Sequence, residues 1–173
     1  MSEYEQQYQL GLFTSDHLPV SSYTPAPNVA VYKVTLVRES SLPMNDRCMR
    51  SSFDAERLIR AHLTGVDREH FVVIMLNRKN EMIGINTVSM GSLAASVVSP
   101  REVFKPAILA NAAGIICGHN PPSGHPQPSH EDRRLTERLV AAGTTLDIPV
   151  LDHIIIGDGT TAFYSFADND ALG

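Results

Sequence analysis

The chain of 173 residues has no tryptophan, only two cysteines and no long apolar run, and each shortage excludes a class of protein. Cys48 and Cys117 are too few for a disulfide framework, so we expect a reducing, cytoplasmic setting. No stretch reaches the roughly 18 apolar residues that a membrane span needs. The opening residues, MSEYEQQYQLGLF, lack the basic and apolar segments of a secretory signal, so we expect none.

Basic residues are also outnumbered: 14 Lys and Arg stand against 19 Asp and Glu, for a net charge of −5. Tight, non-specific binding to nucleic acid depends on neutralising phosphates, so this charge disfavours it. Apolar residues make up 43% of the chain, which is enough for one substantial core. The length fits one domain, alone or with a tail.

The chain divides by composition near residue 28. Residues 1–28 are polar and end in the turn-forming TPAPN, so we predict a tail or docking arm there, a candidate for partner docking or homo-oligomer formation. Residues 29–173 are predicted to form the folded domain. Its first element, VAVYKVTLV (29–37), alternates and is rich in β-branched residues, which predicts a strand.

The rest of the domain mixes helical and strand patterns. Helices are predicted over 51–65, 99–114 and 131–143, and strands over 70–76, 82–90, 94–98, 114–117, 148–157 and 162–167. Pro106 suggests that the second helix starts later than Pro100, because proline is tolerated only in the first helical turn. This order predicts an α/β or α+β sandwich with a hairpin, and not a regular βαβ repeat.

The most distinctive segment is GHNPPSGHPQPSHED, residues 118–132. A strand that ends in His-x-His places both rings on one face, and an acid at the next helix start adds a third ligand. Two imidazoles, a carboxylate and an open position suit a catalytic zinc ion. His119 and Asp132 stand at such positions, but Pro121 occupies the place of the second histidine. From these residues alone the metal site is a weak signal, and a proline-rich turn followed by a helix cap at Ser129 is the favoured interpretation.

HNPPSGHPQPSHED resembles RadC-like proteins of the JAB/MPN (JAMM) superfamily, whose pattern is His-Asn-His-Pro-Ser-Gly-Asp-Pro-x-Pro-Ser-x-x-Asp. The resemblance continues through DREHFVVIMLNRKN, SPREVFKPAILANAAGII and LTERLVAAGTTLDIPVLDHIIIGDG, and covers roughly residues 50–170. It implies a JAB/MPN-like (cytidine-deaminase-like) sandwich, in which helices flank a mixed central β-sheet.

The resemblance also implies an activity, that of a zinc-dependent metallopeptidase or isopeptidase, with a family association with DNA repair. In that role His119 and Asp132 would hold zinc and Glu69 would transfer protons. The Ser129 hydroxyl would stabilise the oxyanion in the transition state. Ser123 matches the serine of the family's His-Pro-Ser-Gly and is expected to contact the substrate, a protein or peptide.

Three positions depart from the family pattern. Pro121 cannot coordinate a metal, His125 replaces an aspartate, and Ser99 stands where relatives often carry histidine. His125 and His130 are candidate substitute ligands, with Cys117 a deeper third, although exposed loop histidines are the ordinary explanation. Two hypotheses therefore stay open: a hydrolase with a repaired ligand set, or a catalytically inactive fold that acts as a protein-interaction or DNA-repair accessory module.

Overall fold

The computed structural model describes residues 29–43, 46–91, 98–157 and 159–173. The chain divides into two units, Met1–Lys33 and Val34–Gly173. Every described helix and strand lies in the second unit. The predicted tail, residues 1–28, lies outside the described residues, as does nearly all of the predicted strand 94–98. None of the described helices is long and apolar enough to cross a membrane.

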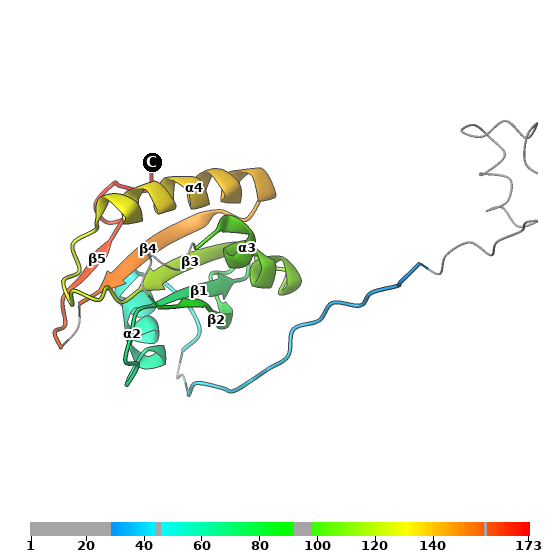
Figure 1. Cartoon of the computed structure of the whole chain (residues 1–173), viewed down its shortest axis with the longest axis horizontal. Helices are drawn as coiled ribbons and strands as arrows, with labels where there is room; N and C mark the ends of the chain where they lie inside the picture. The colour runs from blue at the N-terminus through cyan, green and yellow to red at the C-terminus, as the bar shows by residue number, and fades with distance from the viewer. Residues whose placement is uncertain (1–28, 44–45, 92–97, 158) are drawn as a thin grey trace, which may run out of the picture. The chain divides into compact units, whose positions relative to one another are not determined.

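Five strands form one mixed sheet in the order β2-β1-β3-β4-β5 (Figure 1). They are β1 (His70–Leu76), β2 (Met82–Met90), β3 (Gly114–His119), β4 (Val150–Ile156) and β5 (Phe163–Ser165). Neighbouring strands run antiparallel except β3 and β4, which are parallel. The predicted hairpin and the predicted mixed sheet are confirmed.

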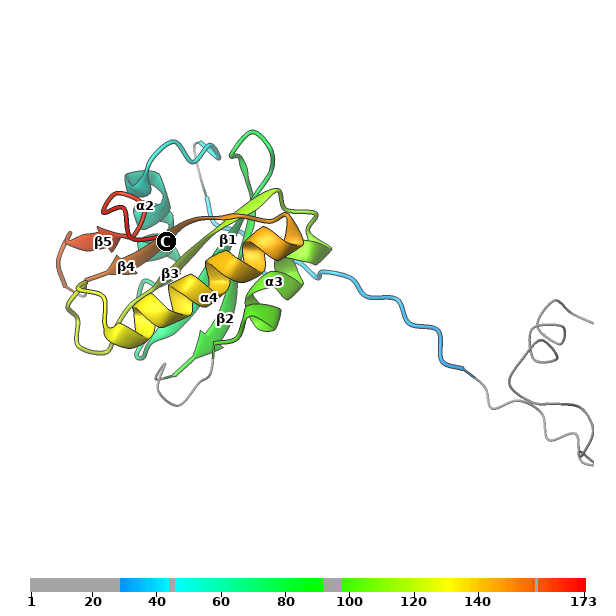
Figure 2. The same cartoon turned by 90° about the horizontal axis from the view of Figure 1, so that it is seen from above.

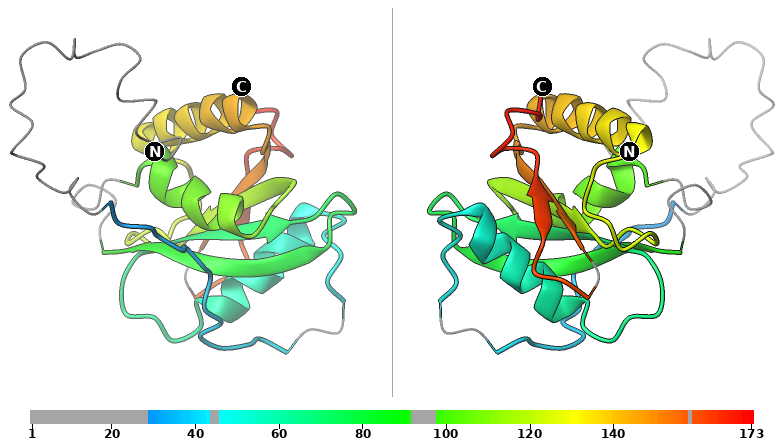
Figure 3. Two further views of the ribbon diagram at one scale, coloured as in Figure 1. Left: turned by 90° about the vertical axis from the view of Figure 1, so that its right-hand side faces the viewer. Right: turned by 90° about the vertical axis from the view of Figure 1, so that its left-hand side faces the viewer.

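Three helices of the described part of the chain cover the two faces of the sheet: α2 (Ser52–His62), α3 (Pro100–Leu109) and α4 (His130–Leu146). Figure 3 shows α2 on one face and both α3 and α4 on the other. Seen from above, α4 lies across the strands as the crossover from β3 to β4 (Figure 2). Such a crossover is what a parallel pair of strands requires. The result is the expected sandwich of helix, sheet and helix.

β1 is buried on both faces and separates two apolar clusters. The α3 and α4 side contains Phe71, Val73, Met75, Phe104, Ile115, Cys117 and Leu139. The α2 side contains Leu58, Ile59, Val72, Ile74, Leu76, Ile116 and Ile154. Side chains alternate between faces along a strand, so a central strand with helices on both sides is apolar throughout.

Gly118 lets α2 approach β3 closely, one residue before the strand ends. A Cβ built at Gly118 would lie 2.4 Å from Cδ1 of Ile59, far inside van der Waals contact. Because that atom is the end of a flexible side chain, a larger residue at this position would first displace the Ile59 side chain, and the Ile154 carbonyl oxygen at 3.3 Å limits the remaining room. The glycine thus lets the Ile59 side chain of α2 lie directly on β3 beside His119.

The start of α3 differs from the prediction. The helix begins at Pro100, with Ser99 as its N-cap, and Pro106 lies inside it. Pro106 is buried on the face that packs against the sheet, together with Val103 and Ala107. The apolar contacts of that face offset the backbone hydrogen bond that proline cannot make. The expected later start was therefore wrong.

The predicted strand 29–37 is not formed. These residues have no strand or helix assigned, and Val31 is 97% exposed. A strand needs a hydrogen-bonded neighbour, and no described strand pairs with this segment. The local pattern was identified correctly, but the pattern does not provide the partner.

Candidate metal centre

His119 ends β3 on the face covered by α4. Its side chain is fully buried, and its ring stacks on Phe71 of β1 at 6.0 Å between centroids. The register pairs His119 with Phe71, so both side chains lie on the same face of the sheet. The strand thus presents one imidazole at the edge of the core, as the sequence predicted.

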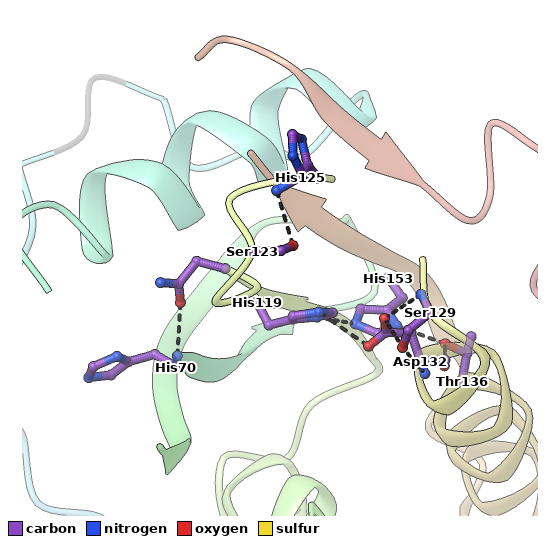
Figure 4. A network of polar contacts seen from close by, with 9 residues as sticks. His70, His119, Ser123, His125, Ser129, Asp132, Thr136 and His153 are labelled. Carbon is purple, nitrogen blue, oxygen red and sulfur yellow. Dashed lines mark hydrogen bonds and ion pairs between the residues drawn. The ribbon is translucent and has the colours of Figure 1, made fainter. Parts of the chain in front are cut away.

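Asp132 comes from the first turn of α4, where a capping box orients it. Its Oδ2 accepts hydrogen bonds from the Ser129 backbone N–H at 2.7 Å and from the Ser129 hydroxyl at 2.6 Å. The Asp132 N–H donates back to Ser129 Oγ at 3.1 Å. This reciprocal cap leaves Oδ1 directed at His119, whose Nε2 is 3.2 Å away (Figure 4). The structure therefore brings His119, Asp132 and Ser129 together.

A chain of hydrogen bonds behind His119 assigns the protons of the site. The single hydroxyl proton of Thr136 goes to the Asp132 carbonyl at 2.7 Å, so Thr136 must accept from His153 Nδ1, also at 2.7 Å. Burial and the neighbouring His119 lower the pKa of His153 to about 3, which keeps its ring neutral. Nε2 of His153 is then an acceptor, and His119 Nδ1–H donates to it at 3.0 Å.

This assignment leaves His119 Nε2 facing a carboxylate oxygen of Asp132 at 3.2 Å. Both atoms are buried and neither has another hydrogen-bond partner. Burial acts to raise the pKa of the Asp132 carboxyl, but the His119 ring and the Ser129 hydrogen bonds outweigh it and hold that pKa well below its usual range. A proton on His119 Nε2 forms an ion pair with Asp132, and when that proton is absent a cation between the two atoms would satisfy both.

The spacing of His119 Nε2 and Asp132 Oδ1 is that of an ion pair and is also compatible with two ligands of one metal ion. Two ligands of one tetrahedral zinc, each about 2.0–2.1 Å from it, stand roughly 3.3 Å apart. His119 Nε2 and Asp132 Oδ1 are 3.2 Å apart. The other ring nitrogen of His119 is hydrogen-bonded to His153, which is the outer-shell support that metal-binding histidines typically have.

The described residues provide no third ligand for this pair. Pro121 opens a turn that is closed by the hydrogen bond from Gly124 N–H to its carbonyl at 3.0 Å. Among the residues that the structure describes, no group of three or more His, Cys, Asp or Glu is placed to hold a metal. Because catalytic zinc uses three protein ligands, the described donors do not complete such a site.

The substitute ligands predicted from the sequence lie elsewhere. His125 and His130 are exposed, and Figure 4 shows His125 in the loop beyond Ser123, away from the His119–Asp132 pair. Ser123 is exposed and accepts a hydrogen bond from His125 N–H at 3.3 Å. Cys117 is buried in the apolar core, where burial raises the pKa of its thiol and disfavours the thiolate that binds metals.

Glu69 is 4% exposed and immediately precedes β1. The Asn120 side chain spans the backbone on both sides of it: Oδ1 accepts from His70 N–H at 2.8 Å, and Nδ2 donates to the Arg68 carbonyl at 3.0 Å. Asn120 thus ties the end of β3 to the backbone on both sides of Glu69, the predicted proton-transfer residue.

Asn120, His153 and Thr136 are the supporting residues to which sequence reasoning gave no role in the site. From the sequence, His153 in the apolar run of β4 is interpreted as a core-packing residue or as the partner of a hydrogen bond to a neighbouring strand, and its hydrogen bond to His119 of β3 agrees with the second interpretation. Its pairing became apparent only when the parallel register set His153 beside Cys117. Thr136 lies one helical turn after Asp132, a spacing that points to a shared face of α4.

A three-layer sandwich in which a histidine at a strand end meets an aspartate at a helix start is the arrangement expected of a JAB domain. The comparison with protein families agrees with this class, since the model of the RadC-like JAB domain matches residues 49–171. The chain belongs to the RadC-like JAB domain family.

Named relatives extend this result. A UPF0758 protein of Rubrobacter xylanophilus is 52% identical over 122 residues, which are 70% of this chain and 52% of the relative. A UPF0758 protein of Caldanaerobacter subterraneus is 55% identical over 106 residues, 61% of this chain and 46% of the relative. The chain thus spans about half the length of the curated relatives it matches.

Proposed function

We propose that this chain is a RadC-like JAB domain with an incomplete metal centre, which binds a protein or peptide segment without hydrolysing it. The observation that carries this proposal is that the described residues place no third donor beside His119 and Asp132, where the loop has Pro121. Two protein ligands form less of a cage than the three that catalytic zinc uses, so zinc should be held weakly.

The hydrogen bonds around the site favour a surface that keeps its shape and can bind a partner. Asn120 still spans the backbone around Glu69. Thr136 still hydrogen-bonds His153, and His153 in turn hydrogen-bonds His119. These contacts keep the end of β3 and the start of β1 in one arrangement even without a third ligand. We therefore expect the surface to retain its shape for the peptide-type segments that the family resemblance implies.

Metal analysis of the full chain tests the proposal. The protein is loaded with excess zinc, dialysed against zinc-free buffer and measured for zinc per chain, beside the variant His119→Ala. We expect far less than one zinc per chain, and no cleavage of peptide or isopeptide test substrates with zinc present. Stoichiometric zinc that disappears in His119→Ala would overturn the proposal.

A second candidate is a zinc-dependent hydrolase whose third ligand comes from the loop. The buried acceptors favour it, because a bound cation would satisfy both. His125 or His130 would have to move inward, and the variants His125→Ala and His130→Ala separate these two donors. Zinc that is retained by the parent chain and lost in one variant would support this candidate.

The family association with DNA repair stays a prediction. The net charge of −5 disfavours strong direct binding to DNA, so a repair role would act through a protein partner. Measuring DNA affinity at several salt concentrations tests this directly. We expect no detectable binding at physiological salt.

A further inference from the structure

The segment Val29–Val37, here called the arm strand, has the side chains of a β-strand, and no described strand pairs with it. Val31, Tyr32 and Val37 are 97%, 84% and 85% exposed. Single exposed apolar residues are ordinary, but nine consecutive residues with a strand pattern and no ladder are not. On one face of such a strand Ala30, Tyr32, Val34 and Leu36 would all be apolar.

The sheet has a matching feature at β2, its long outer strand. Over Gly84–Thr87, β2 pairs regularly with β1 on one side, and no described strand pairs with its other side. Edge strands are usually blunted by charged residues, prolines or bulges. Met82–Met90 contains neither a charge nor a proline. Its pairing with β1 is irregular on both sides of residues 84–87, so these four residues are the regular part of the edge.

The chain itself already touches the beginning of this edge. Cys48 forms an isolated antiparallel bridge with Glu81, and Met82 N–H donates to the Arg47 carbonyl at 2.8 Å. In the register of that bridge, residues 39–47 would follow opposite β2, and they include Pro43 and lack a strand pattern. Val37 would fall beyond the end of β2. A chain that keeps this register does not bring its arm strand to its own edge.

We infer that the arm strand of one copy adds to the β2 edge of a second copy, and that the second copy returns its own arm strand. Added strands bind through main-chain hydrogen bonds, and alternate side chains fill the neighbouring surface. A reciprocal exchange is isologous, so it closes at two copies and leaves no arm strand free for further growth. The chain is then a dimer held by two exchanged strands.

Sedimentation velocity of the full chain over a range of concentrations tests the dimer. We expect a concentration-dependent dimer for the parent chain and a shift toward monomer of at least about tenfold in dissociation constant for Val34→Pro, because proline lacks the N–H that a ladder uses. The matched control Ser40→Pro changes an exposed residue outside the arm strand and should leave the dimer intact. A monomer at every concentration, or a dimer unaffected by Val34→Pro, would overturn the inference.

Hydrogen exchange on the same samples locates the contact. Amides of both 29–37 and 82–90 should gain protection as concentration rises, and Val34→Pro should remove both gains together. Protection of the arm strand without any change in β2 would contradict the assigned edge. Unchanged protection of β1 and β3 in the variant shows that the core remains folded.

Discussion

The two ends of residues 119–132 differ sharply from the loop between them. His119 is fully buried and Asp132 is 5% exposed, and both are fixed by strand, helix cap and hydrogen bonds. The loop between Pro121 and Pro128 has no buried residue and is held by few contacts. The fold thus determines the positions of His119 and Asp132, the two proposed ligands, while the position of the proposed third ligand belongs to a loop outside the core.

The largest expected contrast comes from changing one histidine in each region. His153→Leu leaves the buried His119 Nδ1–H without its acceptor, and we expect a loss of about 2–4 kcal/mol in the free energy of unfolding. His125→Leu makes the same change on the exposed loop and should stay within about 0.5 kcal/mol of the parent. Urea unfolding of the metal-free proteins measures both.

Equal losses in these two variants would break the comparison, because the loop would then contribute to stability as much as the braced end does. A neutral His153→Leu would show that the hydrogen bonds among His119, His153 and Thr136 contribute little to stability. The slope of unfolding against urea should be unchanged in both variants, which confirms that the change lies in stability and not in compactness.

The pH dependence of stability gives an intermediate effect. The pKa of His153 is about 3 in the folded protein, lowered from 6.5. Between these values the unfolded chain binds the proton and the folded chain does not, so stability is full above about pH 6.5 and falls as pH decreases. One proton gives a slope of at most about 1.4 kcal/mol per pH unit. Unfolding curves from pH 7 to 4 should show this slope in the parent and a shallower one in His153→Leu.

The smallest contrast compares two serines. Ser129→Ala removes the N-cap of α4 and should cost about 1 kcal/mol. Ser123→Ala lies in the exposed loop and should change stability by less than about 0.5 kcal/mol. Thermal unfolding of the two variants in parallel tests this, and a larger effect at Ser123 would show that the loop is more tightly held than its contacts indicate.

Much of the fold followed from local patterns. The hairpin 70–90 was visible because an apolar run, a polar turn and a second run succeed one another, and α4 because Ser129 and Asp132 form a cap before apolar residues at helical spacing. The start of α3 was misjudged, since local rules weigh Pro106 against the helix and do not include the face that it buries. The arm strand was misjudged because no local pattern provides a pairing partner.

The candidate site was predictable only in part. His119, Ser129 and Asp132 lie together because each sits at the end of a helix or strand that the sequence indicates. The brace of His153 and Thr136 depends on the parallel register of β3 and β4, which the sequence does not state. The sequence alone showed that Pro121 cannot serve as the proposed third ligand, since proline cannot coordinate a metal in any conformation.

The central claim is that Pro121 alone separates this site from a complete zinc centre. Competitive zinc titration of the parent, of Pro121→His and of Pro122→His tests it most directly. Loss of an outer-shell partner alone costs 10–100-fold in affinity, so we expect Pro121→His to bind zinc more than about 100-fold tighter than the parent. Pro122→His, which adds an imidazole one residue further along, should match the parent. Equal affinity in all three proteins would contradict the account.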